Sequence, residues 1–334
     1  MKDQEIHVLE QYDINVNSTR KVRGAVLCDT KQGLMLLRKL ETSPKRILVL
    51  CRLLECLKEN GFDRIDCIVA NREEQWISVT QEGESYVLKR WFAGKECDIC
   101  KEDDVLKAVR NLAEIHRILR NVNLCGEEKN TLILTGEDLR NTFDRHNREM
   151  KKVRAFIRTK VEKGDFELLF LKYFDAMYEL ARAATQRLEA SEYETLLTQS
   201  RREGHYTHGD YNYHNLLMTG RGIATTNFEH FHQDVQITDL YYFIRKTMEK
   251  NQWSARLCNR MLEAYDRVCP LSEHELTFLA ICISYPEKFW KAANSYYRGS
   301  KVFIPMKSLE KLEVSVRQTE MRKQFLEQTF SFRL

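Results

Sequence analysis

The stretch Tyr206-Thr-His-Gly-Asp-Tyr-Asn-Tyr-His-Asn-Leu-Leu-Met218 decides the fold, because it sets an acid, an amide and a backbone-permissive glycine at a spacing that chemistry can use. Asp210 lies five residues before Asn215, and the apolar run of residues 216–218 follows at once. A carboxylate in such a loop can accept the proton of an attacking hydroxyl, and an amide oxygen can hold a magnesium ion. The stretch therefore predicts a catalytic-type loop that leads into a strand.

This spacing is the layout of a kinase catalytic loop, in which the Asp acts as base and the Asn holds magnesium on the nucleotide phosphates. The motif resembles the H-G-D-x-x-x-x-N loop of the aminoglycoside phosphotransferase and choline kinase superfamily. The resemblance implies ATP and magnesium as cofactors, with Asp210 and Asn215 in these two roles. The alternative is a polar turn before a strand.

The composition provides material for a large core and shows no extreme charge. At 334 residues the chain favours two lobes or one large domain, and 43% of its residues are hydrophobic. A net charge of +4 gives no reason to expect nucleic-acid binding or a membrane surface. No run approaches the length of a membrane span, and the first residues lack the apolar core of a signal peptide. We therefore expect synthesis and folding in the cytosol.

The cysteines and histidines give no strong metal signal. Ten cysteines without regular spacing predict reduced, partly buried thiols, and Cys97-Asp-Ile-Cys100 is at best half of a zinc site. Five of the nine histidines gather around the loop, where hydrogen-bonding roles are expected because no HExxH helix accompanies them. These are His205, His208, His214, His230 and His232.

The chain up to about Trp91 predicts short strands around one helix. Strands are expected at residues 22–27 and 33–40, then a helix opened by Ser43-Pro44 and stopped by Asn60-Gly61, then three strands at 65–69, 76–80 and 86–91. Two strands, a helix and three more strands are the order of a kinase-type N-lobe. In that comparison, the cation that grips the α- and β-phosphates falls at Arg38 or Lys39, and its acidic helix partner would be Glu55. The alternative is a surface cation and a surface acid.

Helical periodicity dominates from residue 92 onward. Apolar stripes recur at helical spacing in residues 105–119, 143–157 and 166–184. We therefore predict an α+β, two-lobed, protein-kinase-like fold, with an N-lobe at residues 1–91 and a helical C-lobe at residues 92–334. The helix of residues 140–158 carries seven basic residues and predicts a basic ridge. This ridge is either a solvated face or a functional surface that docks onto acidic coat proteins or recognises an anionic ligand.

A departure from the superfamily pattern follows the loop. A hairpin of residues 216–226 leads to Asn227-Phe-Glu229, where the superfamily places an Asp-Phe or Asp-Trp pair whose aspartate binds magnesium. An amide supplies an oxygen without the charge that this hard cation prefers. We therefore expect weakened metal-nucleotide affinity, unless Glu229, two residues on in an extended segment, replaces the missing charge. The expected metal ligands are Asn215, Asn227 and Glu229.

The wider sequence resembles one branch of this superfamily, the CotS family of spore coat proteins. The resemblance is carried by Val22-Arg-Gly, by residues 59–62 and 86–94, by the HGD loop, and by Asp234-Val-Gln-Ile-Thr-Asp-Leu-Tyr241 and residues 284–290. It implies a kinase-like fold deposited in the spore coat, with other coat proteins as partners.

Three hypotheses for the function remain open. The first is a coat protein whose phosphotransferase activity is weakened or absent. The second is an ATP-dependent kinase that acts on a small hydroxyl compound or another coat protein. The third is a scaffold that senses nucleotide without turnover.

Overall fold

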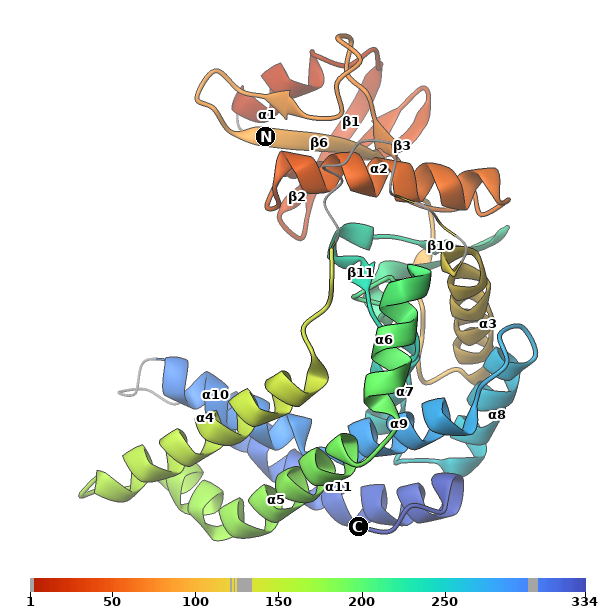
Figure 1. The fold of residues 1–334 in the computed structure, drawn as a ribbon. Coiled ribbons are helices and arrows are strands. Elements are labelled where there is room, and N and C mark those ends of the chain that lie inside the picture. Colours follow the sequence, from red (N-terminus) through yellow and green to blue (C-terminus); the bar gives the residue numbers. More distant parts are fainter. Residues whose placement is uncertain (1–2, 121, 123, 125–133, 300–305) are drawn as a thin grey trace. The chain divides into compact units, whose positions relative to one another are not determined.

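The computed structural model describes residues 3–120, 122, 124, 134–299 and 306–334 (Figure 1). The chain divides into two compact units, one of residues 1–135 with 200–243 and the other of residues 136–199 with 244–334. The predicted N-lobe and the loop of residues 206–218 therefore both lie in the first unit. The lobe boundary near residue 92 stays a prediction.

The first unit contains a six-stranded antiparallel sheet with the strand order β1-β2-β3-β6-β4, and β5 also pairs with β6. Its strands are β1 (Val16–Val22), β2 (Ala25–Thr30), β3 (Gly33–Lys39), β4 (Ile68–Val69), β5 (Ser78–Val79) and β6 (Ser85–Arg90). The prediction of one strand over residues 22–27 was wrong. Arg23 and Gly24 have φ values of 46° and 79° and form the turn between β1 and β2, so three strands precede the first long helix.

The first unit also contains the helices α1 (Asp3–Leu9), α2 (Pro44–Glu59) and α3 (Glu102–Leu119). Helix α2 begins as predicted, because the Ser43 side chain accepts a hydrogen bond from the Arg46 amide and Pro44 occupies the first turn. The chain leaves α2 through Gly61, whose φ is +84°. In Figure 1, α2 runs beside the sheet of its own unit.

Two smaller sheets pair the strands on either side of the loop, β8 and β9, with strands that follow the loop, β11 and β10. One has the order β10-β9-β7, and the other pairs β8 with β11. Their strands are β7 (Lys95–Glu96), β8 (Tyr206–Thr207), β9 (Leu216–Thr219), β10 (Gly222–Thr225) and β11 (His232–Gln233). The predicted hairpin is confirmed, because Leu216 pairs with Thr225 and Thr219 with Gly222. The short 3₁₀ helices η1 (Tyr213–Asn215) and η2 (Phe228–His230) flank it.

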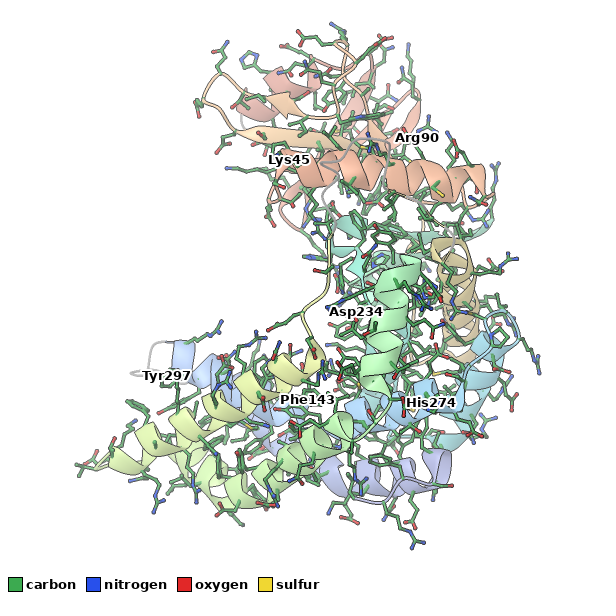
Figure 2. All side chains as sticks on the ribbon, viewed as in Figure 1. Lys45, Arg90, Phe143, Asp234, His274 and Tyr297 are labelled. Carbon is green, nitrogen blue, oxygen red and sulfur yellow. The ribbon has the colours of Figure 1, made fainter. Side chains whose placement is uncertain are left out.

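The second unit is built of helices packed through aromatic side chains. Phe143, labelled in Figure 2, stacks on Tyr285 with ring centroids 4.0 Å apart, and Phe170 stacks on Phe289 at 5.0 Å. Two of the three boundaries between the units fall inside helices, in α6 (Tyr193–Glu203) and α7 (Ile237–Lys250). The other helices are α4 (Leu139–Thr159), α5 (Asp165–Glu189), α8 (Ala255–Asp266), α9 (Glu273–Ser284), α10 (Glu287–Arg298) and α11 (Met306–Phe330).

The predicted helical stripes supply much of the core. The residues that form the apolar stripes at 105–119 and 143–157 are all buried. They are Val105, Val109, Leu112, Ile115, Leu119, Phe143, Met150, Val153 and Ile157. Of the nine cysteines in the described residues, most are buried, in line with the prediction of partly buried thiols. Among the helices that the structure describes, none is long and apolar enough to cross a membrane.

Candidate functional site

The buried carboxylate of Asp239, near the start of α7, anchors the backbone of the loop of residues 206–218. Its two oxygens accept the backbone amides of His208, at 2.7 Å, and of Gly209, at 3.0 Å. The ring of His116 lies 3.1 Å from the same carboxylate. Burial opposes the charge of Asp239, but these hydrogen bonds and the neighbouring histidines outweigh it and lower its pKa. Asp239 therefore fixes the backbone at the point where the catalytic-type aspartate follows.

His208 is fully buried and holds the shape of the loop through hydrogen bonds, the kind of role expected from the sequence. Its Nδ1 accepts the amide of Asp210 at 3.2 Å, so its Nε2 carries the hydrogen and donates to the Thr226 carbonyl at 3.1 Å. Burial lowers the pKa of His208 and keeps the ring neutral, which this pair of hydrogen bonds requires.

Gly209 is required by both its conformation and its surroundings. Its φ is +79°, and a Cβ atom at this position would lie 2.1 Å from the carbonyl oxygen of His230. That contact is far too close for any side chain, so the loop and the last residue of η2 approach each other only because residue 209 is glycine.

Asp210 and Asn215 lie together, as the motif predicts. The Asn215 side chain donates to the Asp210 carboxylate at 2.9 Å and to the Asp210 carbonyl at 2.8 Å. Asn212 donates to the other carboxylate oxygen at 2.8 Å. Asp210 is half-buried, and its carboxylate is held by two side-chain amides.

Asn227 lies beside Asn215, where the hairpin returns the chain. Its Nδ2 donates to the Asn215 side-chain oxygen at 2.8 Å, and its Oδ1 accepts from Arg38 on β3 at 3.0 Å. Its backbone is left-handed, with a φ of 65°, a conformation that Asn and Asp adopt more readily than other residues with side chains. Arg38, Asn227, Asn215 and Asp210 thus form one continuous chain of hydrogen bonds.

A buried ion-pair triad lies next to this chain. Lys89 on β6 is 1% exposed and contacts two carboxylates, Asp66 at 2.8 Å and Glu229 of η2. Asp66 also accepts the backbone amide of Asn227 at 2.9 Å. The triad therefore fixes the backbone of residue 227 as well as neutralising Lys89.

The pKa values in the triad follow from burial and from the shared ammonium. Burial alone would lower the pKa of Lys89, but the two carboxylates raise it. Burial raises the pKa of Asp66 in spite of Lys89. Burial also opposes the charge of Glu229, but the Lys89 ammonium prevails and lowers the pKa of Glu229 to about 2.

Arg46 of α2 fastens the turn that carries Glu229. Its Nε donates to the Glu229 carbonyl and its Nη2 to the Phe231 carbonyl, both at 2.6 Å. This turn is a 3₁₀ helix, so the extended segment expected after Asn227 does not form, and Glu229 turns toward Lys89.

The two cations predicted to grip phosphate, Arg38 and Lys39, and their predicted acidic partner Glu55 lie in three different environments. Arg38 reaches the site, whereas Lys39 is exposed and pairs with Glu84. Glu55 is exposed on α2, and in the described part of the chain it forms no ion pair with either cation. Sequence reasoning missed Lys89 and Asp66, for which the only sign was a lysine among the apolar residues of a strand.

The sequence matches a known protein family over nearly its whole length. The family model described as "Spore coat putative kinase YutH" matches residues 5–329. The chain belongs to this family. Spore coat protein S of Bacillus subtilis (strain 168) is 22% identical over 291 residues, which are 86% of this chain and 81% of that protein. The predicted resemblance to the CotS branch and the assignment to the spore coat are thereby confirmed.

Solved structures confirm the predicted kinase-like fold for this YutH-family chain. An aminoglycoside phosphotransferase from Alicyclobacillus acidocaldarius subsp. acidocaldarius DSM 446 has a TM-score of 0.85 at 18% identity, over 98% of this chain and 95% of that one. Spectinomycin phosphotransferase, solved as an AMP-bound complex, has a TM-score of 0.68 at 12% identity, over 96% and 97% of the two chains. At these identities the likeness concerns the fold.

Proposed function

We propose that this YutH-family protein serves the spore coat as a structural body, and that its kinase-like site does not transfer phosphate as it stands. The hydrogen-bond chain from Arg38 through Asn227 and Asn215 to Asp210 carries the proposal. It occupies the groups that an active site of this type would offer to magnesium and to the substrate hydroxyl.

The direction of this chain follows from the chemistry of its two ends. A guanidinium has only donors, so Asn227 turns its oxygen toward Arg38 and its NH₂ group toward Asn215. Asn215 must then face Asn227 with its oxygen and Asp210 with its NH₂ group. The Asp210 carboxylate has only acceptors and ends the chain. Both amide oxygens therefore already accept a hydrogen bond, and a charge at each end polarises the chain.

These residues do not fit a magnesium ion in this arrangement. Magnesium demands near-octahedral oxygen ligands and is usually held by one or two carboxylates. The described residues contain no group of three or more His, Cys, Asp or Glu side chains that could hold a metal. Asp66 and Glu229 each have one buried oxygen with no hydrogen bond, but both carboxylates share the Lys89 ammonium, which repels a second cation.

A structural role in the coat agrees with the many contacts that hold the shape of the site. The loop anchor at Asp239, the inward His208 and the Lys89 triad all hold the shape of the site. We infer that other coat proteins are the partners, because the protein belongs to a family of the spore coat.

A thermal-shift titration with ATP, with and without magnesium, tests the proposal. We expect no magnesium-dependent rise in Tm for the natural protein, because a ligand raises Tm only when it binds the folded state. Asn227→Asp should gain such a rise, since Asp tolerates the left-handed backbone and returns an anionic oxygen. The gain should disappear in Asn227→Asp with Asn215→Ala.

An active ATP-dependent phosphotransferase is the second candidate, and the intact pair of Asp210 and Asn215 favours it. Transfer of phosphate or hydrolysis of ATP by the natural protein, lost in Asp210→Asn, would establish it and overturn the structural proposal. Stabilisation by ATP that needs no magnesium would point instead to a nucleotide-sensing scaffold.

A further inference from the structure

The second unit contains a cavity of about 590 Å³ between α7, α10 and α11, and its wall is strongly basic. Five lysines line it, with a single carboxylate among the lining residues. They are Lys246, Lys288, Lys291, Lys307 and Lys311, and the carboxylate is Glu310. Cavities of this volume are typical of small-molecule sites. We call these residues the lysine pocket.

The carboxylates around the lysine pocket neutralise only part of its charge. Glu249 lies 3.2 Å from Lys288, and Glu287 lies 2.9 Å from Lys291. Glu249 is also engaged by Arg245 at 2.8 Å, so a single carboxylate serves two cations. In the described residues, Lys307 and Lys311 form no ion pair. The pocket thus retains excess positive charge.

Two of the lysines are also partly removed from water. Burial lowers the pKa of Lys246, and the nearby Arg245 lowers it further. Burial likewise lowers the pKa of Lys288, although Glu249 opposes this. Ammonium groups that are desolvated and close to other cations are stabilised by an anion.

On the basic ridge of α4, by contrast, some of the cations have carboxylate partners close by. There Arg145 pairs with Glu137, and Arg154 pairs with Asp175 at 3.0 Å. Arg154 also lies over the ring of Phe174. Several cations of the ridge therefore already have partners within their own unit. This favours the interpretation of the ridge as a solvated surface.

We propose that the lysine pocket binds a compact polyanion, a small molecule with several phosphate or carboxylate groups. Ammonium groups that converge from three helices match several oxyanions at once, and each acts as a point charge without demanding the planar geometry of an arginine fork. The hydroxyl groups of Ser295 and Ser308, which also line the cavity, supply neutral donors. The site is separate from the chain of Arg38 to Asp210 and does not depend on the function proposed for it.

Calorimetry with two probes tests this binding, inorganic tripolyphosphate as the phosphate source and citrate as the carboxylate source. The pocket variant is Lys307→Gln with Lys311→Gln, four residues apart on an exposed face of α11. The matched control is Arg148→Gln with Lys152→Gln, which have the same spacing and exposure on α4. We expect Kd to rise at least about tenfold for the pocket variant, to stay unchanged for the control, and to rise with salt. The preferred probe identifies which oxyanion chemistry the pocket selects.

The kinase-like site offers a competing explanation for tripolyphosphate binding, so Arg38→Gln is measured in parallel. Binding that survives Arg38→Gln and weakens in the pocket variant supports the proposal. Binding that is lost in Arg38→Gln, or that weakens equally in the pocket and control variants, overturns it. Binding of neither probe at millimolar concentration also overturns it. Lys291→Gln, on α10, repeats the test from a second helix.

Discussion

Lys89 and the lysine pocket place the same side chain in two opposite electrostatic settings, each within its own unit. Lys89 is one ammonium between two carboxylates, 1% exposed, in the first unit. In the lysine pocket of the second unit, five ammonium groups share the wall with one glutamate. Partners, more than burial, thus decide what a lysine does. Where carboxylates outnumber it, the lysine organises the fold, and where lysines outnumber carboxylates, the charge is left for a ligand.

Replacing Lys89 should have the largest effect. Lys89→Met leaves Asp66 and Glu229 without a counter-ion, and each already has one buried oxygen without a hydrogen bond. Removing one partner of a buried ion pair costs about 3–5 kcal/mol of unfolding free energy, which urea denaturation would measure.

Two further variants isolate the cause of that loss. Lys39→Met, at an exposed lysine of β3 that pairs with Glu84, should leave the unfolding free energy nearly unchanged. Adding Asp66→Asn and Glu229→Gln to Lys89→Met should restore much of the loss, because the uncompensated charges are then gone. If Lys89→Met alone unfolds at the same urea concentration as the natural protein, the triad does not organise the fold.

Lowering the pH should have the second-largest effect, because it protonates Glu229 of the same triad. The folded-state pKa of Glu229 is lowered to about 2, so its contribution to stability is present above the unfolded pKa and is lost as the pH falls from about 4.5 toward 2. The loss is on the order of 3 kcal/mol. We expect the difference in unfolding free energy between the natural protein and Glu229→Gln to shrink over this pH range. A difference that stays constant with pH would mean that Glu229 is not ionised in the fold.

The sequence predicts the local parts of this picture well. Ser43-Pro44 and Gly61 bound α2 because caps and turns depend on neighbouring residues, and the hairpin after Asn215 follows from the alternation of apolar runs with a glycine turn. The turn at Arg23-Gly24 was missed, because Val22 before it and the apolar run of residues 25–27 after it resembled one continuous strand, and the mostly polar, exposed residues of β1 gave no strand signal.

The contacts that define the site are long-range and could not be read from local patterns. Lys89 meets a residue 23 positions away and another 140 positions away, and Arg38 meets Asn227 across 189 positions. A lysine in a strand is normally taken to be on the solvent-exposed face. The residues next to Lys89 in the sequence give no sign of its two carboxylate partners, Asp66 and Glu229. The loop motif did indicate Asp210 and Asn215, and the resemblance to the superfamily indicated Asn227, which the local hairpin returns to Asn215.

Replacing Lys246 should have the smallest effect, and in the opposite direction. Its lowered pKa means that the fold disfavours its charge, so the charge costs stability at neutral pH, and this cost fades as the pH rises through the folded-state pKa. Lys246→Met keeps the apolar stem and removes the ammonium, so the unfolding free energy should stay equal or rise by up to about 1 kcal/mol. The same Lys→Met change would then be severe at residue 89 and harmless at residue 246, which urea denaturation at pH 7 compares directly. If Lys246→Met destabilises the protein as much as Lys89→Met does, the Lys246 ammonium is part of a structural ion pair, as Lys89 is. The lysine pocket would then not use this charge to bind an anion.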